Sequence, residues 1–207
     1  MSLRLWDERV VPRLTDLSLR GTEVGELREV ACAGLTGRVL EIGFGSGLNV
    51  RWYPGEVTGV TAIEPSDLAW QLSERRRART GLPVERAGLD GQRLDLADGS
   101  HDSALVTFSL CTIPDALRAL REVRRVVRDG GTLHVLEHGL APDEPVRRWQ
   151  RRLEPVQRAI AGGCHLTRDV PALVAEAGWH VRELQQEYLP GPAASRPWTF
   201  GYRLRAD

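Results

Sequence analysis

The chain has 207 residues, of which 42% are hydrophobic and 27% charged, so one compact globular unit is expected rather than a disordered or fibrous protein. Twenty-eight basic and 28 acidic residues give a net charge of zero, which excludes an overall electrostatic attraction to nucleic acid. Every basic residue is arginine, and the absence of lysine excludes Schiff-base chemistry and a P-loop lysine.

The cysteine content and the apolar segments indicate where such a protein would work. Cys32, Cys111 and Cys164 are too few and too scattered for a disulfide framework, which favours a reducing compartment. No apolar stretch reaches the roughly 20 residues that span a bilayer, and the first residues lack the apolar core of a signal peptide. We therefore expect a soluble, cytoplasmic protein.

The order of predicted elements is typical of an α/β protein. Apolar residues three and four apart predict a helix over residues 3–17, broken near Pro12, and a second one over 23–32. From Arg38 onward short β-branched runs alternate with helical patterns. The predicted strands cover residues 39–42, 57–63, 84–87, 104–108, 132–137, 181–188 and 199–205, and the predicted helices cover 67–80, 114–128, 144–160 and 169–177.

These elements predict a doubly wound, Rossmann-like α/β fold with a seven-stranded sheet, helices on both faces and the last strand antiparallel. The turn-rich Pro190-Gly191-Pro192 stretch predicts a hairpin between the last two strands. No linker or repeat divides the chain, so we expect one domain. Within it, residues 1–35 would form a helical cap, 38–139 a cofactor-binding core, and 140–207 the substrate-side helices and closing strands.

The strongest local signal is the segment Glu41-Ile42-Gly43-Phe44-Gly45-Ser46-Gly47, a strand that runs into a glycine loop and is expected to open a helix. A dinucleotide-binding loop has the spacing Gly-x-Gly-x-x-Gly, whereas here the third glycine comes one residue early. Glu41 would contribute little to a diphosphate site but accepts hydrogen bonds from an ammonium group. S-adenosylmethionine carries an ammonium group and no phosphate.

Further candidate residues follow the next strands, where a doubly wound sheet binds its ligands. Glu64-Pro65 ends the second strand, and a carboxylate there can hold both ribose hydroxyls. Leu89-Asp90-Gly91 follows the third strand, within reach of an adenine amino group. Phe108-Ser109 ends the fourth strand beside the same crevice. Two acids and three spaced glycines in this order predict an adenosine-containing cofactor.

With these motifs, the chain resembles the class I S-adenosylmethionine-dependent methyltransferases. The segments Asp98 to Asp102, Leu110 to Ile113, Glu137-His138 and Gly163 to Asp169 are similar to the branch that contains animal alkyl-thiol methyltransferases and their bacterial relatives. The resemblance implies a seven-stranded sheet with a reversed last strand, methionine contacts at the glycine loop and ribose contacts at Glu64. Animal members begin with a hydrophobic membrane anchor, whereas this sequence begins with a charged amphipathic segment.

Residues at the carboxyl ends of the fourth and fifth strands would lie nearest the transferred methyl group. His138 is the candidate general base, with a histidine bonded to backbone at a strand end as the alternative. Cys111 is the second candidate catalytic residue, and it could also line the acceptor pocket. Together with Cys164 these residues match no zinc-binding spacing, so we expect no metal ion.

The sequence thus predicts a methyltransferase that uses S-adenosyl-L-methionine and acts on a small, hydrophobic acceptor, with a thiol favoured. Carbon methylation of a quinone-like ring, nitrogen methylation of a lipid head group, a non-catalytic cofactor-binding module and an NAD-dependent oxidoreductase are the alternatives. We expect no nucleic-acid partner. The basic stripe Arg147, Arg148, Arg151 and Arg152 is interpreted as a solvated face, with a membrane surface as its alternative. The oligomeric state and the methyl acceptor are left open.

Overall fold

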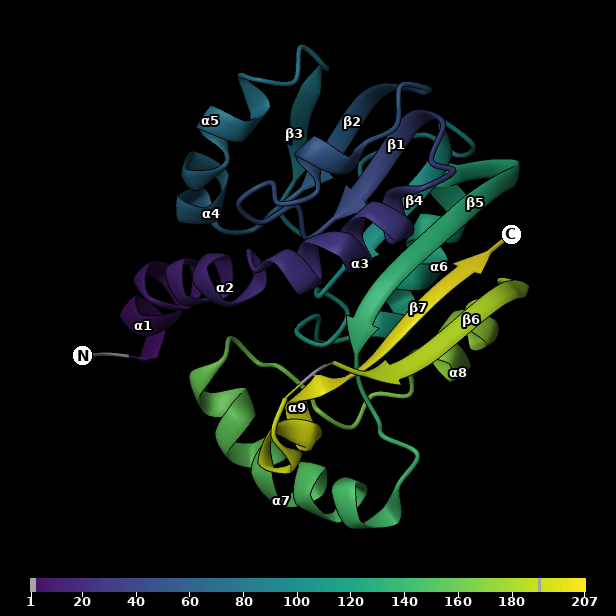
Figure 1. Cartoon of the computed structure of the whole chain (residues 1–207). Helices are drawn as coiled ribbons and strands as arrows, with labels where there is room; N and C mark the ends of the chain where they lie inside the picture. Colours follow the sequence, from purple (N-terminus) through teal and green to yellow (C-terminus); the bar gives the residue numbers. More distant parts are fainter. Residues whose placement is uncertain (1–2, 190) are drawn as a thin grey trace.

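A computed structural model describes residues 3–189 and 191–207. Its centre is a seven-stranded sheet in the order β3-β2-β1-β4-β5-β7-β6 (Figure 1). The strands are β1 (Gly37–Ile42), β2 (Val57–Ile63), β3 (Val84–Gly88), β4 (His101–Thr107), β5 (Val127–His138), β6 (Val181–Tyr188) and β7 (Phe200–Ala206). The first five pair in parallel, and β7 runs antiparallel to both β5 and β6. The predicted fold class is confirmed.

The sheet is covered by helices on both faces. They are α1 (Leu3–Arg9), α2 (Val11–Leu19), α3 (Thr22–Cys32), α4 (Asp67–Leu72), α5 (Glu74–Arg77), α6 (Ala116–Val126), α7 (Glu144–Ile160), α8 (Val170–Glu176) and α9 (Arg196–Thr199). Side-chain caps begin two of those predicted from sequence: Asp115 accepts from Arg118 N at α6, and Asp169 accepts from Ala172 N at α8. The central strands are buried over most of their length, with Leu40, Leu105 and Leu133 all at 0% exposure, which explains their apolar character.

Two expectations about local structure were wrong. An α-helix does not follow the glycine loop; the chain makes turns and the 3-10 helix η1 (Val50–Trp52) instead. Only six residues separate Gly47 from Pro54, and the residue before a proline is disfavoured in helices. The helix predicted over 67–80 is divided at Ser73, whose hydroxyl donates to Trp70 O.

The predicted antiparallel pairing of β6 with β7 is confirmed. The connection between the two strands contains a 3-10 turn (Ala193–Ser195) and α9. Two aromatic residues hold this part of the chain in place. Trp198 Nε1 donates to Gln157 Oε1 of α7, and Phe200 is buried in the core. Pro190, on which the hairpin prediction partly rested, lies outside the described residues.

The two N-terminal helices lie beside the carboxyl ends of the central strands (Figure 1). α1 packs against α2 and α7, and α2 packs against α4. Trp6 Nε1 donates to Ile160 O at 2.8 Å, and Ser46 Oγ donates to Asp16 Oδ1 at 2.6 Å. The first contact ties α1 to the end of α7, and the second ties α2 to the glycine loop. The pair therefore covers the edge of the sheet at which doubly wound folds bind ligands.

Three arginines of the basic stripe of α7 share one acidic partner on the same helix. Glu144 makes ion pairs with Arg147, Arg148 and Arg151 at 3.0, 3.7 and 2.8 Å. The Arg152 guanidinium stacks 5.4 Å from the Trp149 ring centre. Such pairing is expected of a solvated face. No helix within residues 3–189 and 191–207 has both the length and the apolar composition required to cross a bilayer.

Candidate active site

The glycine loop lies directly against the segment that follows β4. Gly43, Gly45 and Gly47 have φ angles of +71°, +59° and +74°, which side-chain-bearing residues rarely adopt. A Cβ on Gly43 would lie 1.9 Å from Ser109 Oγ and 2.5 Å from Ser109 Cβ. Glycine at position 43 is therefore required by backbone conformation and by space, whereas a Cβ on Gly45 would lie no closer than 3.9 Å to any atom.

This difference predicts unequal costs for two alanine substitutions. Gly45→Ala should lower the free energy of unfolding by about 1–2 kcal/mol, the cost of a left-handed backbone at a residue with a Cβ. Gly43→Ala adds a steric clash and should lower it by a further amount of about 2 kcal/mol. Urea unfolding of both variants checks this, and equal losses would contradict the close packing of Gly43 on Ser109.

Glu64 anchors the same loop from the end of β2. Its carboxylate accepts hydrogen bonds from Gly45 N at 2.6 Å and from Ser66 N at 2.7 Å, and the residue is only 5% exposed. Burial raises the pKa of Glu64, while the two backbone donors act in the opposite direction. The acid is thus held rigidly where β2 meets the glycine loop.

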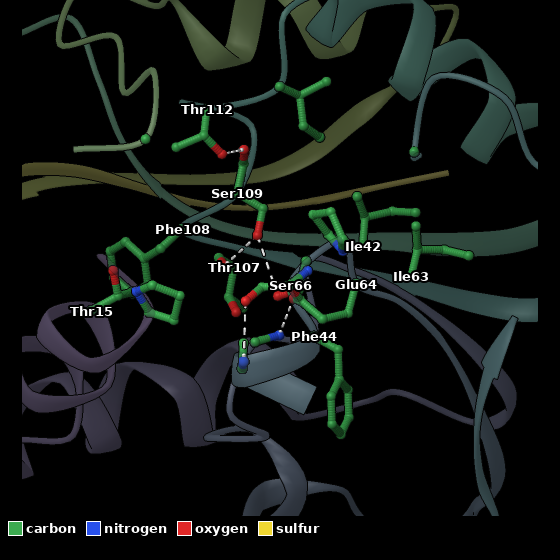
Figure 2. A pocket seen from close by; sticks show the side chains of 18 of the residues that line it. Thr15, Ile42, Phe44, Ile63, Glu64, Ser66, Thr107, Phe108, Ser109 and Thr112 are labelled. Carbon is green, nitrogen blue, oxygen red and sulfur yellow. Dashed lines mark hydrogen bonds between the residues drawn. The ribbon is translucent and has the colours of Figure 1, made fainter. Parts of the chain in front are cut away.

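A cavity of about 450 Å³ opens between the loop, the strand ends and the N-terminal helices (Figure 2). Its volume is within the usual range for a small-molecule site. The predicted cofactor residues that line it are Gly43, Phe44, Gly45, Glu64, Pro65, Leu89, Asp90, Gly91, Phe108 and Ser109. The structure therefore brings together ten residues that the sequence places at four separate strand ends. α2 contributes Thr15, Asp16 and Leu19 to the opposite wall.

Asp90 is exposed, as are Pro65 and Leu89 in the same group. Its Oδ1 accepts from Gln92 N at 2.9 Å and from Gln92 Nε2 at 2.8 Å. These hydrogen bonds lower the pKa of Asp90, so its carboxylate is ionised at neutral pH. An ionised side chain at this end of the cavity can accept a hydrogen bond from an amino group.

Glu41 and Gly47 do not line the cavity. The Glu41 side chain is fully buried beneath the loop, where Asn49 Nδ2 donates to Oε1 at 2.7 Å and the Tyr53 hydroxyl donates to Oε2. Desolvation raises the pKa of Glu41 to about 7, against the effect of these donors and of Arg28. Glu41, which the motif suggested as a partner for an ammonium group, thus faces Asn49 and Tyr53 in this structure.

Arg28 is a cavity residue that the sequence did not single out. It lies on α3, is 4% exposed and lines the cavity wall. Its Nη1 donates to Asn49 Oδ1 at 2.6 Å and to Thr107 Oγ1 at 2.9 Å, and its guanidinium lies 5.2 Å from the Phe108 ring centre. Its Nε has no hydrogen-bond partner among the described residues. A lone arginine in a predicted helix is too common to have indicated this position.

A second, smaller cavity of about 120 Å³ adjoins the first, because Phe108 and Leu19 line both. Its wall is mostly apolar, with Leu27, Leu136 and Trp198 among its residues, and it includes His138. Phe108 adopts a φ of +49°, unusual for a residue with a side chain. Of the two predicted catalytic residues, His138 thus lies at an apolar cavity, whereas Cys111 is buried at 3% exposure and lines neither cavity.

His138 is bonded to a cysteine rather than to backbone. Its Nε2 lies 3.2 Å from Cys164 Sγ, and its Nδ1 has no partner among the described residues. Hydrogen bonds from Cys111 and His138 lower the pKa of the Cys164 thiol. The alternative interpretation, a histidine bonded to backbone at a strand end, does not describe this residue.

Comparison with known proteins identifies the family to which the chain belongs. Residues 40–135 match the methyltransferase domain family. The chain is 33% identical to rat thiol S-methyltransferase TMT1B over 74% of its own length and 64% of that protein, and 32% identical to human thiol S-methyltransferase TMT1A over 84% and 73%. A methyltransferase of solved structure from Haloferax volcanii, in complex with the Trm112 activator, superposes with a TM-score of 0.73 at 17% identity, covering 99% of this chain and 96% of that one.

The match spans about two thirds of the length of the animal relatives, and the likeness to the solved structure extends over nearly the whole chain. The family match and the fold agree with each other. The chain belongs to the class I S-adenosylmethionine-dependent methyltransferases.

Proposed function

We propose that this chain binds S-adenosylmethionine in the 450 Å³ cavity and transfers its methyl group to a small hydrophobic thiol in the adjoining cavity. The observation that carries the proposal is that one cavity combines a buried carboxylate, Glu64, with a buried guanidinium, Arg28. A ribose diol fits the first group, and the carboxylate of an amino acid fits the second. A sulfonium cofactor presents both.

The glycine loop supports this cofactor over a dinucleotide. A diphosphate is normally held by the free amide groups at the N-terminus of an α-helix. Here turns and the three-residue η1 follow the loop. Within the described residues, the glycine loop therefore does not lead into the N-terminus of an α-helix. The positive φ angles of the three glycines instead allow the backbone to approach a ligand closely.

The cofactor supplies an electrophilic methyl group, and the protein's task is alignment and exclusion of water. Arg28 and Glu64 would hold the cofactor at two points, and α1 and α2 cover the cavity from the solvent side. Phe108, in the shared wall, separates the cofactor cavity from the apolar one. An acceptor in the apolar cavity would therefore approach the methyl group past this ring.

A thiol suits this second cavity because it needs little help to ionise. The ordinary thiol pKa is about 8.5, whereas a phenol or an amine would require a base such as His138. The relatives named thiol S-methyltransferases support the same acceptor class. Carbon methylation of a quinone-like ring and nitrogen methylation of a lipid head group are the competing reactions.

The proposal is tested by incubating the protein with labelled S-adenosylmethionine and matched acceptors of one chain length: an alkyl thiol, the corresponding alcohol and the corresponding amine. We expect the methyl thioether to form, together with S-adenosylhomocysteine, and no product from the alcohol. A quinol and an ethanolamine lipid complete the panel. If the quinol or the ethanolamine lipid were methylated and no thioether formed, the proposed acceptor would be that compound and not a thiol.

The role of Arg28 can be separated from a structural one by the choice of ligand. S-adenosylhomocysteine carries an amino acid carboxylate, and 5′-methylthioadenosine lacks it. Arg28→Met should weaken binding of the first about 10- to 100-fold, the effect of one or two hydrogen bonds to a charged group, and leave the second unchanged. Titration calorimetry measures both. Equal weakening of the two ligands would show that Arg28 acts on the fold of the cavity and not on the carboxylate.

A further inference from the structure

Three soft-ligand side chains from distant segments meet beside the apolar cavity. Cys111 lies in the loop after β4, His138 is the last residue of β5, and Cys164 lies in the loop between α7 and α8. Their two Sγ atoms and a ring nitrogen all lie within 4.8 Å of one another. One of these distances, 3.2 Å, joins Cys164 Sγ to His138 Nε2. Both cysteines are buried, at 3% and 6% exposure, and neither forms a disulfide.

This spacing is close to that of a tetrahedral metal site. Zinc–sulfur bonds of about 2.3 Å and zinc–nitrogen bonds of about 2.0–2.1 Å place ligand atoms about 3.6–3.8 Å apart. The three atoms found here can therefore reach one ion through shifts of about 1 Å or less. Two thiolates and an imidazole favour zinc or another thiophilic ion over magnesium and calcium, which prefer oxygen ligands.

The ligands are held in place by the surrounding backbone. Cys111 N donates to Glu137 Oε2 at 2.8 Å, and His165 N donates to Cys111 O at 2.9 Å. The first bond fixes the loop after β4 to the end of β5, and the second fixes it to the loop that carries Cys164. Such supporting contacts orient ligands before an ion arrives. By contrast, Cys32 is buried between α3 and the sheet, outside this cluster.

We propose that Cys111, His138 and Cys164 bind one zinc ion, which joins the β4–α6 loop, the end of β5 and the α7–α8 loop. The spacing of these residues along the chain matches no zinc-binding pattern, and the fold brings them together. Three protein ligands leave a tetrahedral ion one open position, the arrangement of catalytic rather than structural zinc sites. An ion bound through Nε2 occupies the nitrogen that faces Cys164 and excludes a proton-accepting role for that atom.

Cobalt(II) is the probe for the first experiment, because tetrahedral cobalt bound by thiolates absorbs in the near ultraviolet and the visible. The full chain is reduced, stripped with a chelator and titrated with Co²⁺. We expect the wild type and the control Cys32→Ser to bind one equivalent with thiolate bands that Zn²⁺ then abolishes. Cys111→Ser and Cys164→Ser should lose the bands and bind at least about a hundredfold more weakly.

Thermal unfolding gives a second readout that does not depend on activity. Zn²⁺ should raise the midpoint of the wild type and of Cys32→Ser, and leave that of Cys164→Ser unchanged. Circular dichroism of each variant establishes that it is folded. The proposal is overturned if the reduced wild type binds no cobalt with thiolate bands, or if all four proteins bind it equally. Recovery of a Cys111–Cys164 disulfide in place of metal binding would equally overturn it.

Discussion

Replacing Glu64 by alanine is expected to weaken the binding of S-adenosylhomocysteine and of 5′-methylthioadenosine by the same factor, about a hundredfold or more. Both ligands contain the ribose, and the Glu64 carboxylate would accept hydrogen bonds from its two hydroxyls. A hydrogen bond to a charged group contributes about 1.5–3 kcal/mol, and each 1.4 kcal/mol corresponds to a factor of ten in affinity. Titration calorimetry with the two ligands measures the effect.

The pattern across the two ligands distinguishes Glu64 from Arg28. Arg28→Met should affect only the ligand that carries a carboxylate, whereas Glu64→Ala should affect both. Glu85→Ala, which removes an exposed acid from the neighbouring strand β3, is the matched control and should change neither affinity. If Glu64→Ala bound both ligands with the affinity of the wild type, Glu64 would not be the residue that binds the ribose.

The Glu64 variant also loses contacts within the protein, since its carboxylate accepts from Gly45 N and Ser66 N. Glu64→Gln separates the two effects. An amide has one acceptor oxygen and would point a donor at one of these N–H groups, so the loop is perturbed at constant side-chain size. We expect Glu64→Gln to weaken both ligands less than Glu64→Ala, in equal proportion.

Replacing Glu41 by glutamine is expected to make stability less sensitive to pH. Desolvation raises the pKa of Glu41 to about 7 in the folded protein, above its unfolded value near 4.5. The folded state therefore binds the proton more tightly, so the wild type loses stability as pH rises from about 4.5 to about 7. Glutamine does not titrate, and this loss disappears in the variant.

The expected size of the effect follows from the shift. At about 1.4 kcal/mol for each pKa unit, the free energy of unfolding of Glu41→Gln relative to wild type should increase by about 3 kcal/mol between pH 5 and pH 8. Urea unfolding at the two pH values measures this change, and rearranged hydrogen bonds to Asn49 and Tyr53 cancel as a constant offset. Glu137, also fully buried, is present in both proteins and cancels as well.

Glu85→Gln serves as the control, because Glu85 is exposed and its replacement removes a carboxylate from the surface. Its stability relative to wild type should vary little over the same pH interval. A Glu41→Gln difference that is likewise independent of pH would mean that Glu41 titrates in the folded protein as it does in the unfolded chain. Its burial would then carry no electrostatic cost.

Local pattern and residue type alone determined the sheet and much of the lining of the 450 Å³ cavity. Each strand has its own run of apolar residues, and the carboxyl ends of parallel strands meet at one edge. Glu64, Asp90 and Ser109 therefore could be placed near the glycine loop without coordinates. Helix caps such as Asp169 were equally accessible, because a cap depends on residues three apart.

Other features depended on contacts between distant segments, and only the tertiary structure decided them. Glu41 faces Asn49 and Tyr53 rather than the cavity, because the chain after the glycine loop makes turns that place these donors beneath it. Arg28 reaches the cavity because α3 packs across the sheet beside β4. Cys111, His138 and Cys164 lie close together because the loop after β4, the end of β5 and the loop between α7 and α8 meet in the folded chain. Sequence spacing predicts neighbours along one helix or strand, whereas the packing of whole elements against one another brings these groups together.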